Sequence, residues 1–162
     1  MSIKRREAKL ERESYSFPGG TINWKEVESD PEGGWPGIYG KVETEQVITR
    51  ENAGSTGLVV GRSVYHKGAY HEPHMHFHAE EFMFCLSGKG IVGSGDKEYL
   101  LTPGDFQFAK KQEIHWLRNP FDEPVEFIWT YSGASMPFES GYATTDHFKE
   151  AMALSKKNNF PK

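Results

Sequence analysis

Short apolar segments, separated by turns rich in glycine and proline, recur along most of the chain. The clearest is 58–66, which is rich in valine, and the run 82–86 is equally short and ends at Ser87 and Gly88. Apolar runs of this length, rich in β-branched or aromatic residues and bounded by turn residues, indicate strands. Further strands are expected over 21–27, 38–48, 91–92, 98–101, 106–109, 114–118 and 125–131, with a turn over 51–55.

The spacing of these segments predicts the fold class. Strands that recur about every 8–12 residues are typical of an all-β sandwich or barrel. The length of 162 residues suits one domain. One helix is expected at 147–154, capped by Thr145 or Asp146 and apolar along one face. We therefore expect a charged arm (1–14), a β-barrel domain (15–135) and a C-terminal segment (136–162) whose helix packs outside the barrel.

Composition excludes several functional classes and indicates a compartment. The net charge is −4, with 19 basic and 23 acidic residues, so nothing indicates a nucleic-acid surface. No apolar stretch approaches the roughly 20 residues that a membrane span needs. The single cysteine, Cys85, excludes an intrachain disulfide framework. The basic N-terminus is followed by no apolar region, so it is not a secretory signal, and we expect a cytoplasmic protein.

Four histidines lie within eight residues in the middle of the chain: His71, His74, His76 and His78. Histidine clusters also occur on surfaces and in tags, but this one is internal and interleaved with apolar residues. On a strand, His74 and His76 share a face about 6.6 Å apart, and imidazoles so placed can share one metal ion. The following Glu80 or Glu81 would supply a carboxylate. The same alternation predicts that His71 points away.

The stretch 68–88 resembles the first motif of the cupins, and a second cupin motif follows it. The first motif reads Gly, five residues, His-x-His, three or four residues, Glu, six residues, Gly. It is matched by Gly68, His74, His76, Glu81 and Gly88, and the closing glycine selects Glu81 over Glu80. The second motif is matched by Gly104, His115 and Asn119. Two positions depart from it, because Lys110 and Gln112 replace a proline and a glycine that normally shape the turn before the histidine strand.

This resemblance implies a fold and a cofactor. The fold would be a double-stranded β-helix, or jelly-roll, barrel. The cofactor would be one divalent transition metal per chain (Fe, Mn, Ni, Co or Zn), held by His74, His76, Glu81 and His115. Three nitrogens and one carboxylate oxygen suit such ions. An octahedral ion would keep two positions open for substrate, water or dioxygen, whereas structural zinc sites usually use several cysteines.

Neighbouring residues are candidates for catalysis and substrate binding. His78 shares the parity of His74 and His76, so it is a candidate proton carrier, with an ordinary turn residue as the alternative. Met83 and Cys85 would follow Glu81 into the barrel and, with Leu117, form an apolar wall. Tyr70 would add a hydroxyl at its mouth. The candidate substrate-binding residues are Arg62, Tyr70, Met83, Cys85 and Leu117, with Arg62 either holding a substrate carboxylate or lying on the surface.

Three functions follow from the resemblance. The first is a metal-dependent dioxygenase that acts on a small oxygenated molecule. The second is a non-redox lyase, decarboxylase or isomerase in which the metal is a Lewis acid, and the third is a non-catalytic binder of small ligands. The partners expected are a small-molecule substrate and a second copy of the chain in a homodimer, with Trp24 and Trp35 as candidate contacts, and neither nucleic acid nor membrane.

Overall fold

The structure is a computed structural model that describes residues 22–30 and 35–144. The predicted arm (1–14) and the predicted helix (147–154) lie outside the described residues. Within the described ranges, no helix is long and apolar enough to cross a membrane.

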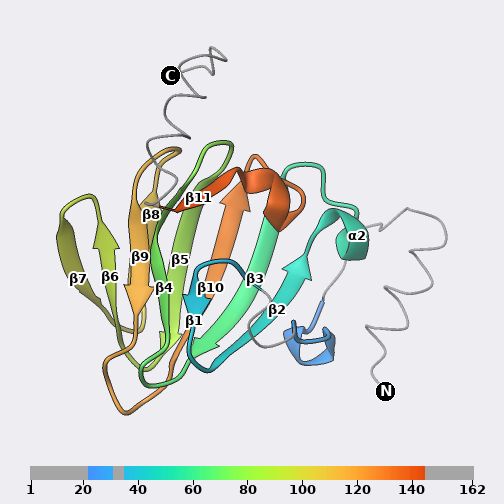
Figure 1. The fold of residues 1–162 in the computed structure, drawn as a ribbon. Coiled ribbons are helices and arrows are strands. Elements are labelled where there is room, and N and C mark those ends of the chain that lie inside the picture. Colours follow the sequence, from blue (N-terminus) through green and yellow to red (C-terminus); the bar gives the residue numbers. More distant parts are fainter. Residues whose placement is uncertain (1–21, 31–34, 145–162) are drawn as a thin grey trace.

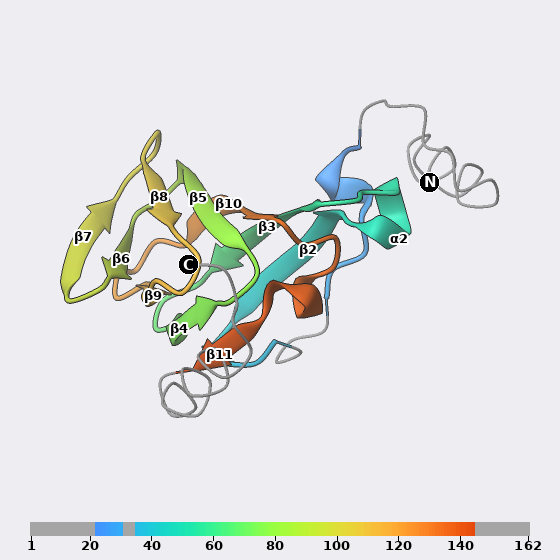
Figure 2. The same cartoon turned by 90° about the horizontal axis from the view of Figure 1, so that it is seen from above.

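Two antiparallel sheets face each other and form a double-stranded β-helix sandwich (Figures 1 and 2). The six-stranded sheet contains β1 (Ile38–Tyr39), β4 (Tyr70–His76), β9 (His115–Arg118), β6 (Gly90–Ser94) and β7 (Lys97–Leu101) in that order, with β11 (Tyr142–Thr144) also paired to β4. The five-stranded sheet contains β2 (Val42–Ile48), β3 (Leu58–Tyr65), β10 (Val125–Ser132), β5 (Glu80–Ser87) and β8 (Phe106–Ala109) in that order. The all-β fold is therefore confirmed, and β11 joins the sheet from beyond the expected barrel boundary at residue 135.

Two predicted elements are wrong because short polar side chains cap backbone amides. The region expected to form a strand over 21–27 contains a 3-10 helix, η1 (Trp24–Glu26), and the Asn23 side chain accepts a hydrogen bond from the Lys25 amide. The expected turn at 51–55 begins within the short helix α2 (Arg50–Ala53). A capping box between Thr49 and Asn52 supplies hydrogen-bond partners at the start of this helix. A second 3-10 helix, η2 (Pro137–Ser140), leads into β11.

The inner faces of the two sheets form one apolar core. Along β5 the buried residues alternate as predicted: Glu81, Met83 and Cys85 point inward, whereas Phe82 and Leu86 are exposed. The opposite sheet contributes buried side chains from β9, β6 and β7. The histidine motif therefore lies between two apolar layers and not on the surface.

Strand β4 contains a β-bulge that reverses the facing of its first half. His71 pairs with Leu117 and His74 pairs with His115, so three residue steps along β4 lie opposite two steps along β9. The extra residue breaks the two-residue alternation, and His71 therefore faces inward like His74. The prediction that His71 points away is wrong. Pro73 is the signal that was available, because proline within a strand is confined to edges and bulges.

The turn before β9 keeps the shape that its motif requires although the glycine is missing. Gln112 occupies that position with φ of 65°, and among the described residues it is the one non-glycine residue with positive φ. The Gln112 amide donates to the His76 carbonyl (2.8 Å), and the Glu113 amide donates to the Lys110 carbonyl (3.1 Å). The first bond holds the turn against the His76 end of β4, and the second closes the turn itself. Because Gln112 is not a glycine, the positive φ strains its backbone.

Replacing Gln112 by glycine is expected to raise the free energy of unfolding by up to about 1 kcal/mol. The left-handed region costs an L-residue about 1–2 kcal/mol, and glycine would avoid this cost. Glycine also loses more backbone entropy on folding, which offsets part of the gain in stability. Gln112→Val should instead lower the free energy of unfolding, because a β-branched residue tolerates positive φ poorly. Denaturant unfolding of the three proteins measures the order, and a valine variant as stable as the glycine variant would contradict it.

The outer face of the five-stranded sheet carries a row of exposed aromatic side chains on β5 and β8. Phe82 lies opposite Phe108, and Phe84 lies opposite Phe106, whose ring packs on that of Phe84 with centroids 4.4 Å apart. Phe106 and Phe108 are more than half exposed. The expected homodimer stays a prediction, and this aromatic row offers more exposed apolar surface to a second copy than Trp35, whose ring packs against Trp129 inside the chain.

Candidate metal centre

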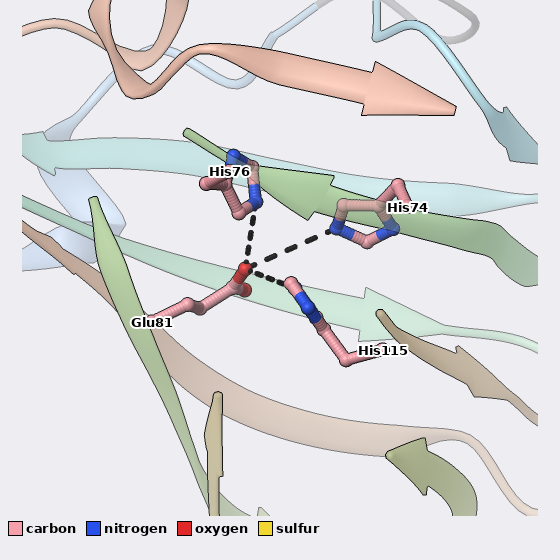
Figure 3. Close-up of side chains that lie close together, drawn as sticks. All are labelled: His74, His76, Glu81 and His115. Atoms are coloured by element: carbon pink, nitrogen blue, oxygen red, sulfur yellow. Dashed lines mark hydrogen bonds and ion pairs between the residues drawn. The ribbon is translucent and has the colours of Figure 1, made fainter. Parts of the chain in front are cut away.

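Four buried side chains from three strands converge on one point between the sheets (Figure 3). His74 and His76 come from β4, Glu81 from β5 and His115 from β9. The Glu81 Oε2 atom lies 2.8 Å from His115 Nε2, 3.0 Å from His76 Nε2 and 3.9 Å from His74 Nε2. The structure therefore brings together all four residues that the cupin resemblance implies. The exposed Glu80 lies outside the cluster, so the carboxylate is that of Glu81.

The Nδ1 atoms of the three histidines all have hydrogen-bond partners on the outside of the cluster. His74 Nδ1 lies 2.7 Å from the Glu72 carbonyl and His115 Nδ1 lies 2.9 Å from the Glu113 carbonyl. A carbonyl only accepts, so these two Nδ1 atoms carry protons, and each Nε2 faces the cluster, where it would offer a lone pair to an ion once the ring is neutral. His76 Nδ1 lies 2.9 Å from Ser140 Oγ at the end of η2. The surrounding backbone thus fixes ring orientation before any ion binds.

The geometry of the four donor atoms fits one metal ion. Donors about 2.1 Å from a common ion lie roughly 3.0–4.2 Å apart, and the four atoms here lie within 4.8 Å of one another. Small rotations of the side chains would bring the four atoms into range of a single ion. The buried His74 Nε2 has no hydrogen-bond partner, which an ion would provide. Three nitrogens and one carboxylate suit a divalent transition metal, so the cluster could hold one such ion.

Mutual electrostatics shift the pKa values of these groups in opposite directions. Burial, reinforced by His115, lowers the pKa of His74 to about 4. Burial alone would raise the pKa of Glu81, but the neighbouring histidines, His115 above all, more than offset it and hold that pKa well below its usual range. Burial alone would lower the pKa of His115, but the Glu81 carboxylate raises it above the ordinary value. The metal-free cluster therefore holds its proton on His115.

Metal affinity is expected to rise with pH until His115 has lost its proton. A metal ion must displace that proton, so below the raised pKa of His115 the apparent affinity should increase about tenfold per pH unit, and above it the affinity should level off. His74 is already neutral above pH 5 and adds no slope. Titration with Zn(II) between pH 6 and pH 9 measures this. His66→Gln, which changes an exposed pair with Glu43, should keep the same profile, and a pH-independent affinity would contradict the assignment.

A pocket opens beside the cluster, with His74 and Glu81 in its wall. Met83 and Leu117 line it as predicted from the sequence. Cys85 is buried in the core but does not line the pocket, and its Sγ lies 3.7 Å from the Ser87 carbonyl. The remaining described lining residues are Trp35, Ile38, Thr44, Ser63, Tyr65, His71, Trp116, Phe127, Trp129 and Tyr131.

His71 is the pocket residue that strand alternation missed. The bulge in β4 stacks its ring on that of His74, with centroids 3.8 Å apart and an interplanar angle of 22°. Its Nε2 is buried and has no hydrogen-bond partner. Burial, reinforced by His74, holds the pKa of His71 well below its ordinary value, so the ring is neutral at pH 7.

Three other candidates lie outside the pocket. Arg62 points to the outer face of β3, where its guanidinium pairs with Glu45 and Glu126 and stacks on Trp24, so it is not available for a substrate carboxylate. Tyr70 faces outward because it precedes the bulge, and it stacks on Tyr39 with centroids 4.9 Å apart. His78 lies exposed in the bend after β4, where its amide donates to the Ser140 carbonyl. Strand parity does not continue past the end of β4 at His76.

A double-stranded β-helix with a buried cluster of three histidines and one glutamate defines the class of metal-binding cupins. The sequence agrees, because residues 61–131 match the family described as Cupin domain. This part of the chain is a cupin domain.

Solved structures share the fold at low sequence identity. A predicted oxalate decarboxylase from Thermotoga maritima has a TM-score of 0.64 at 20% identity, over 70% of this chain and 98% of that one. The polyketide cyclase RemF from Streptomyces resistomycificus has a TM-score of 0.63 at 16% identity, over 74% and 82%. A cupin sugar phosphate isomerase from Silicibacter pomeroyi has a TM-score of 0.59 at 17% identity, over 70% and 75%.

One curated relative is a much longer protein. A mannose-1-phosphate guanylyltransferase from Salmonella muenchen is 28% identical over 75 residues, which make up 46% of this chain. The match spans only 16% of that relative's length. These likenesses establish the fold, and they leave the reaction to the chemistry of the site.

Proposed function

We propose that the protein is a metal-dependent enzyme that acts on a small, oxygen-bearing organic molecule. The observation that carries the proposal is the convergence of three histidine Nε2 atoms and the Glu81 carboxylate at the wall of a pocket. A purely structural ion needs no adjoining pocket. A bound divalent ion would supply Lewis acidity toward a substrate oxygen.

The chain's own residues prepare the pocket for such a substrate. Met83 and Leu117 exclude water from one side of the cluster, since both are almost fully buried. Burial, reinforced by the Glu81 charge, raises the pKa values of the Tyr65 and Tyr131 hydroxyls. Both phenols therefore keep their protons at pH 7 and would donate hydrogen bonds to a ligand beside the carboxylate.

Non-redox chemistry is the reaction class that we place first. The pocket holds neutral imidazole and protonated hydroxyl groups, which suit the transient charges of lyase, decarboxylase, isomerase or cyclase reactions. The related folds described as decarboxylase, cyclase and isomerase agree with this choice only as analogies of fold. A dioxygenase is the second candidate, and the apolar wall of Met83 and Leu117 favours it because that wall suits dioxygen.

Metal analysis followed by a substrate screen tests the proposal. Protein purified without chelators should contain close to one divalent ion per chain, and a His74→Ala/His115→Ala variant should contain none. A panel of small acids, enols and phenols is then supplied to the Mn(II) or Zn(II) protein under strict anaerobiosis, and to the Fe(II) protein in air. Anaerobic turnover supports the non-redox class, whereas turnover with stoichiometric oxygen uptake only in air supports the dioxygenase. Tight binding of several compounds without consumption of any would identify a non-catalytic binder and overturn the enzyme proposal.

A further inference from the structure

His71 has a placement that the metal cluster does not explain. The bulge in β4 costs a regular pair of the β4–β9 ladder and brings this ring into the pocket. Its buried Nε2 has no hydrogen-bond partner, and an unpartnered buried polar group is costly enough to require an explanation. His71 is not among the four residues of the cluster.

Several other polar groups that line the pocket already have hydrogen-bond partners within the chain. Trp129 Nε1 donates to Ser63 Oγ at 3.0 Å, and Ser63 Oγ lies 2.8 Å from Thr44 Oγ1. Trp35 Nε1 donates to Asp30 Oδ2 at 3.1 Å. Among the described residues that line the pocket, only His71 and His74 keep a buried ring nitrogen without a partner. Since His74 Nε2 belongs to the metal cluster, His71 Nε2 is, beside the Tyr65 and Tyr131 hydroxyls, the polar group of the pocket left to bond a ligand.

The walls of the pocket are mostly aromatic. Trp35 meets Trp129 edge to face, with centroids 5.6 Å apart and an interplanar angle of 75°, and the Trp129 ring lies 5.1 Å from that of Tyr131. Phe127 and Tyr65 continue this wall, with ring centroids 5.3 Å apart. Aromatic walls favour flat ligands, because stacking and edge contacts add to the burial of area.

The charge of the pocket restricts the ligand further. No lysine or arginine occurs among the described lining residues, and Glu81 is their one acidic member. Arg62, the buried arginine on β3, is directed to the opposite face of the sheet and is paired with Glu45 and Glu126. A bound divalent ion and the Glu81 carboxylate would together leave a net charge of only +1 at the cluster. With no cationic side chain to add to it, a phosphate dianion would bury part of its charge unpaired, which is unfavourable.

We propose that the pocket takes a planar, conjugated molecule with two neighbouring oxygen atoms and no phosphate, and that His71 Nε2 positions it by a hydrogen bond to one of its oxygens. The neighbouring oxygens face the metal cluster beside His74, and the flat skeleton lies against the Trp35 and Trp129 wall. This inference rests on the proposed function, because the metal cluster must be loaded for the oxygens to be held. His71 is a positioning residue that sequence alternation assigned to the wrong face.

Ligand binding to the Zn(II)-loaded full chain tests the inference without any need for turnover. The probes are catechol, which is planar with neighbouring oxygens, cis-1,2-cyclohexanediol, which has the same oxygens on a saturated ring, and phenyl phosphate, which is planar but phosphorylated. Quenching of tryptophan fluorescence and calorimetry measure each Kd. Catechol should bind at least about tenfold more tightly than either of the other two probes.

Variants then isolate the contribution of His71. His71→Ala should weaken catechol binding by about three- to tenfold, with unchanged Zn(II) content, and His71→Asn should recover part of the loss because the amide can still hydrogen-bond. His78→Ala, in the exposed bend after β4, is the matched control and should bind catechol like the wild type.

If the wild type bound the saturated diol or phenyl phosphate about as tightly as catechol, the proposed ligand class would be wrong. This comparison uses the wild type alone, so it does not depend on the folding of any variant. Unchanged catechol binding in a folded His71→Ala protein would overturn the role of His71. Failure of the wild type to bind Zn(II) would instead refute the proposed function on which the inference rests.

Discussion

Replacing His76 by alanine is expected to lower the affinity for Zn(II) by more than about 100-fold, since even a change in an outer partner of a metal ligand costs about 10–100-fold. His76 contributes one of three Nε2 atoms and is buried beside Glu81. Its removal also takes away a hydrogen-bond partner of a buried carboxylate. The increase in Tm on addition of Zn(II), which follows from binding to the native state alone, should be lost at concentrations that stabilise the wild type.

Two further variants make this a graded series. Ser140→Ala removes only the hydroxyl that lies 2.9 Å from His76 Nδ1, so we expect an intermediate loss of about 10–100-fold. His78→Ala leaves the cluster untouched and should match the wild type. Calorimetric titration and elemental analysis check the order, and equal affinity in the His76 and His78 variants would show that the cluster is not the metal site.

The two glycines that bracket the first cupin motif are expected to respond very differently to replacement by alanine. Gly88 has φ of 69°, and a Cβ there would lie 1.9 Å from the Pro124 carbonyl oxygen. Gly68 has φ of 82°, but a Cβ there would meet nothing within 4 Å. Gly68→Ala should therefore cost only the left-handed backbone, about 1–2 kcal/mol. Gly88→Ala should cost about 4 kcal/mol or more, because backbone must also move.

Gly54 is the matched control for these variants, since it has φ of 67° and open space around it but lies outside both motifs. Gly54→Ala should resemble Gly68→Ala in the free energy of unfolding. Chemical denaturation of the three variants measures the differences. A Gly88→Ala protein no less stable than the Gly68 variant would show that the approach of Pro124 is not tight.

Most of the barrel was predictable because the physical signal is local. The expected strands 58–66, 106–109 and 125–131 coincide with β3, β8 and β10 to within a residue at either end. Burial in β5 alternates as the sequence requires, which placed Glu81 and Met83 on the inner face. The spacing of the two motifs identified the four residues of the cluster, although His115 is 34 residues away from Glu81 along the chain.

Other features of the site depend on packing that no local pattern expresses. Arg62 faces outward because Glu45 and Glu126 flank it on the neighbouring strands β2 and β10, and strand pairing must be known before those neighbours are. The inward facing of His71 and the outward facing of Tyr70 both follow from the bulge, which two-residue alternation cannot represent. The strained turn at Gln112 was indicated by its place in the second motif, since glycine is the usual residue there and φ is positive.

The extra residue in β4 decides which side chain reaches the pocket. A strand of the same length that paired regularly with β9 would turn every side chain before His74 to the other face, so that His71 would point outward and the phenol of Tyr70 would enter the pocket in place of an imidazole. Deleting Pro73 would instead place His71 two residues before His74, and regular pairing would then keep the imidazole in the pocket. Among related chains, the loss of one residue here therefore preserves the ligand-facing group, whereas the loss of the bulge at constant length exchanges it.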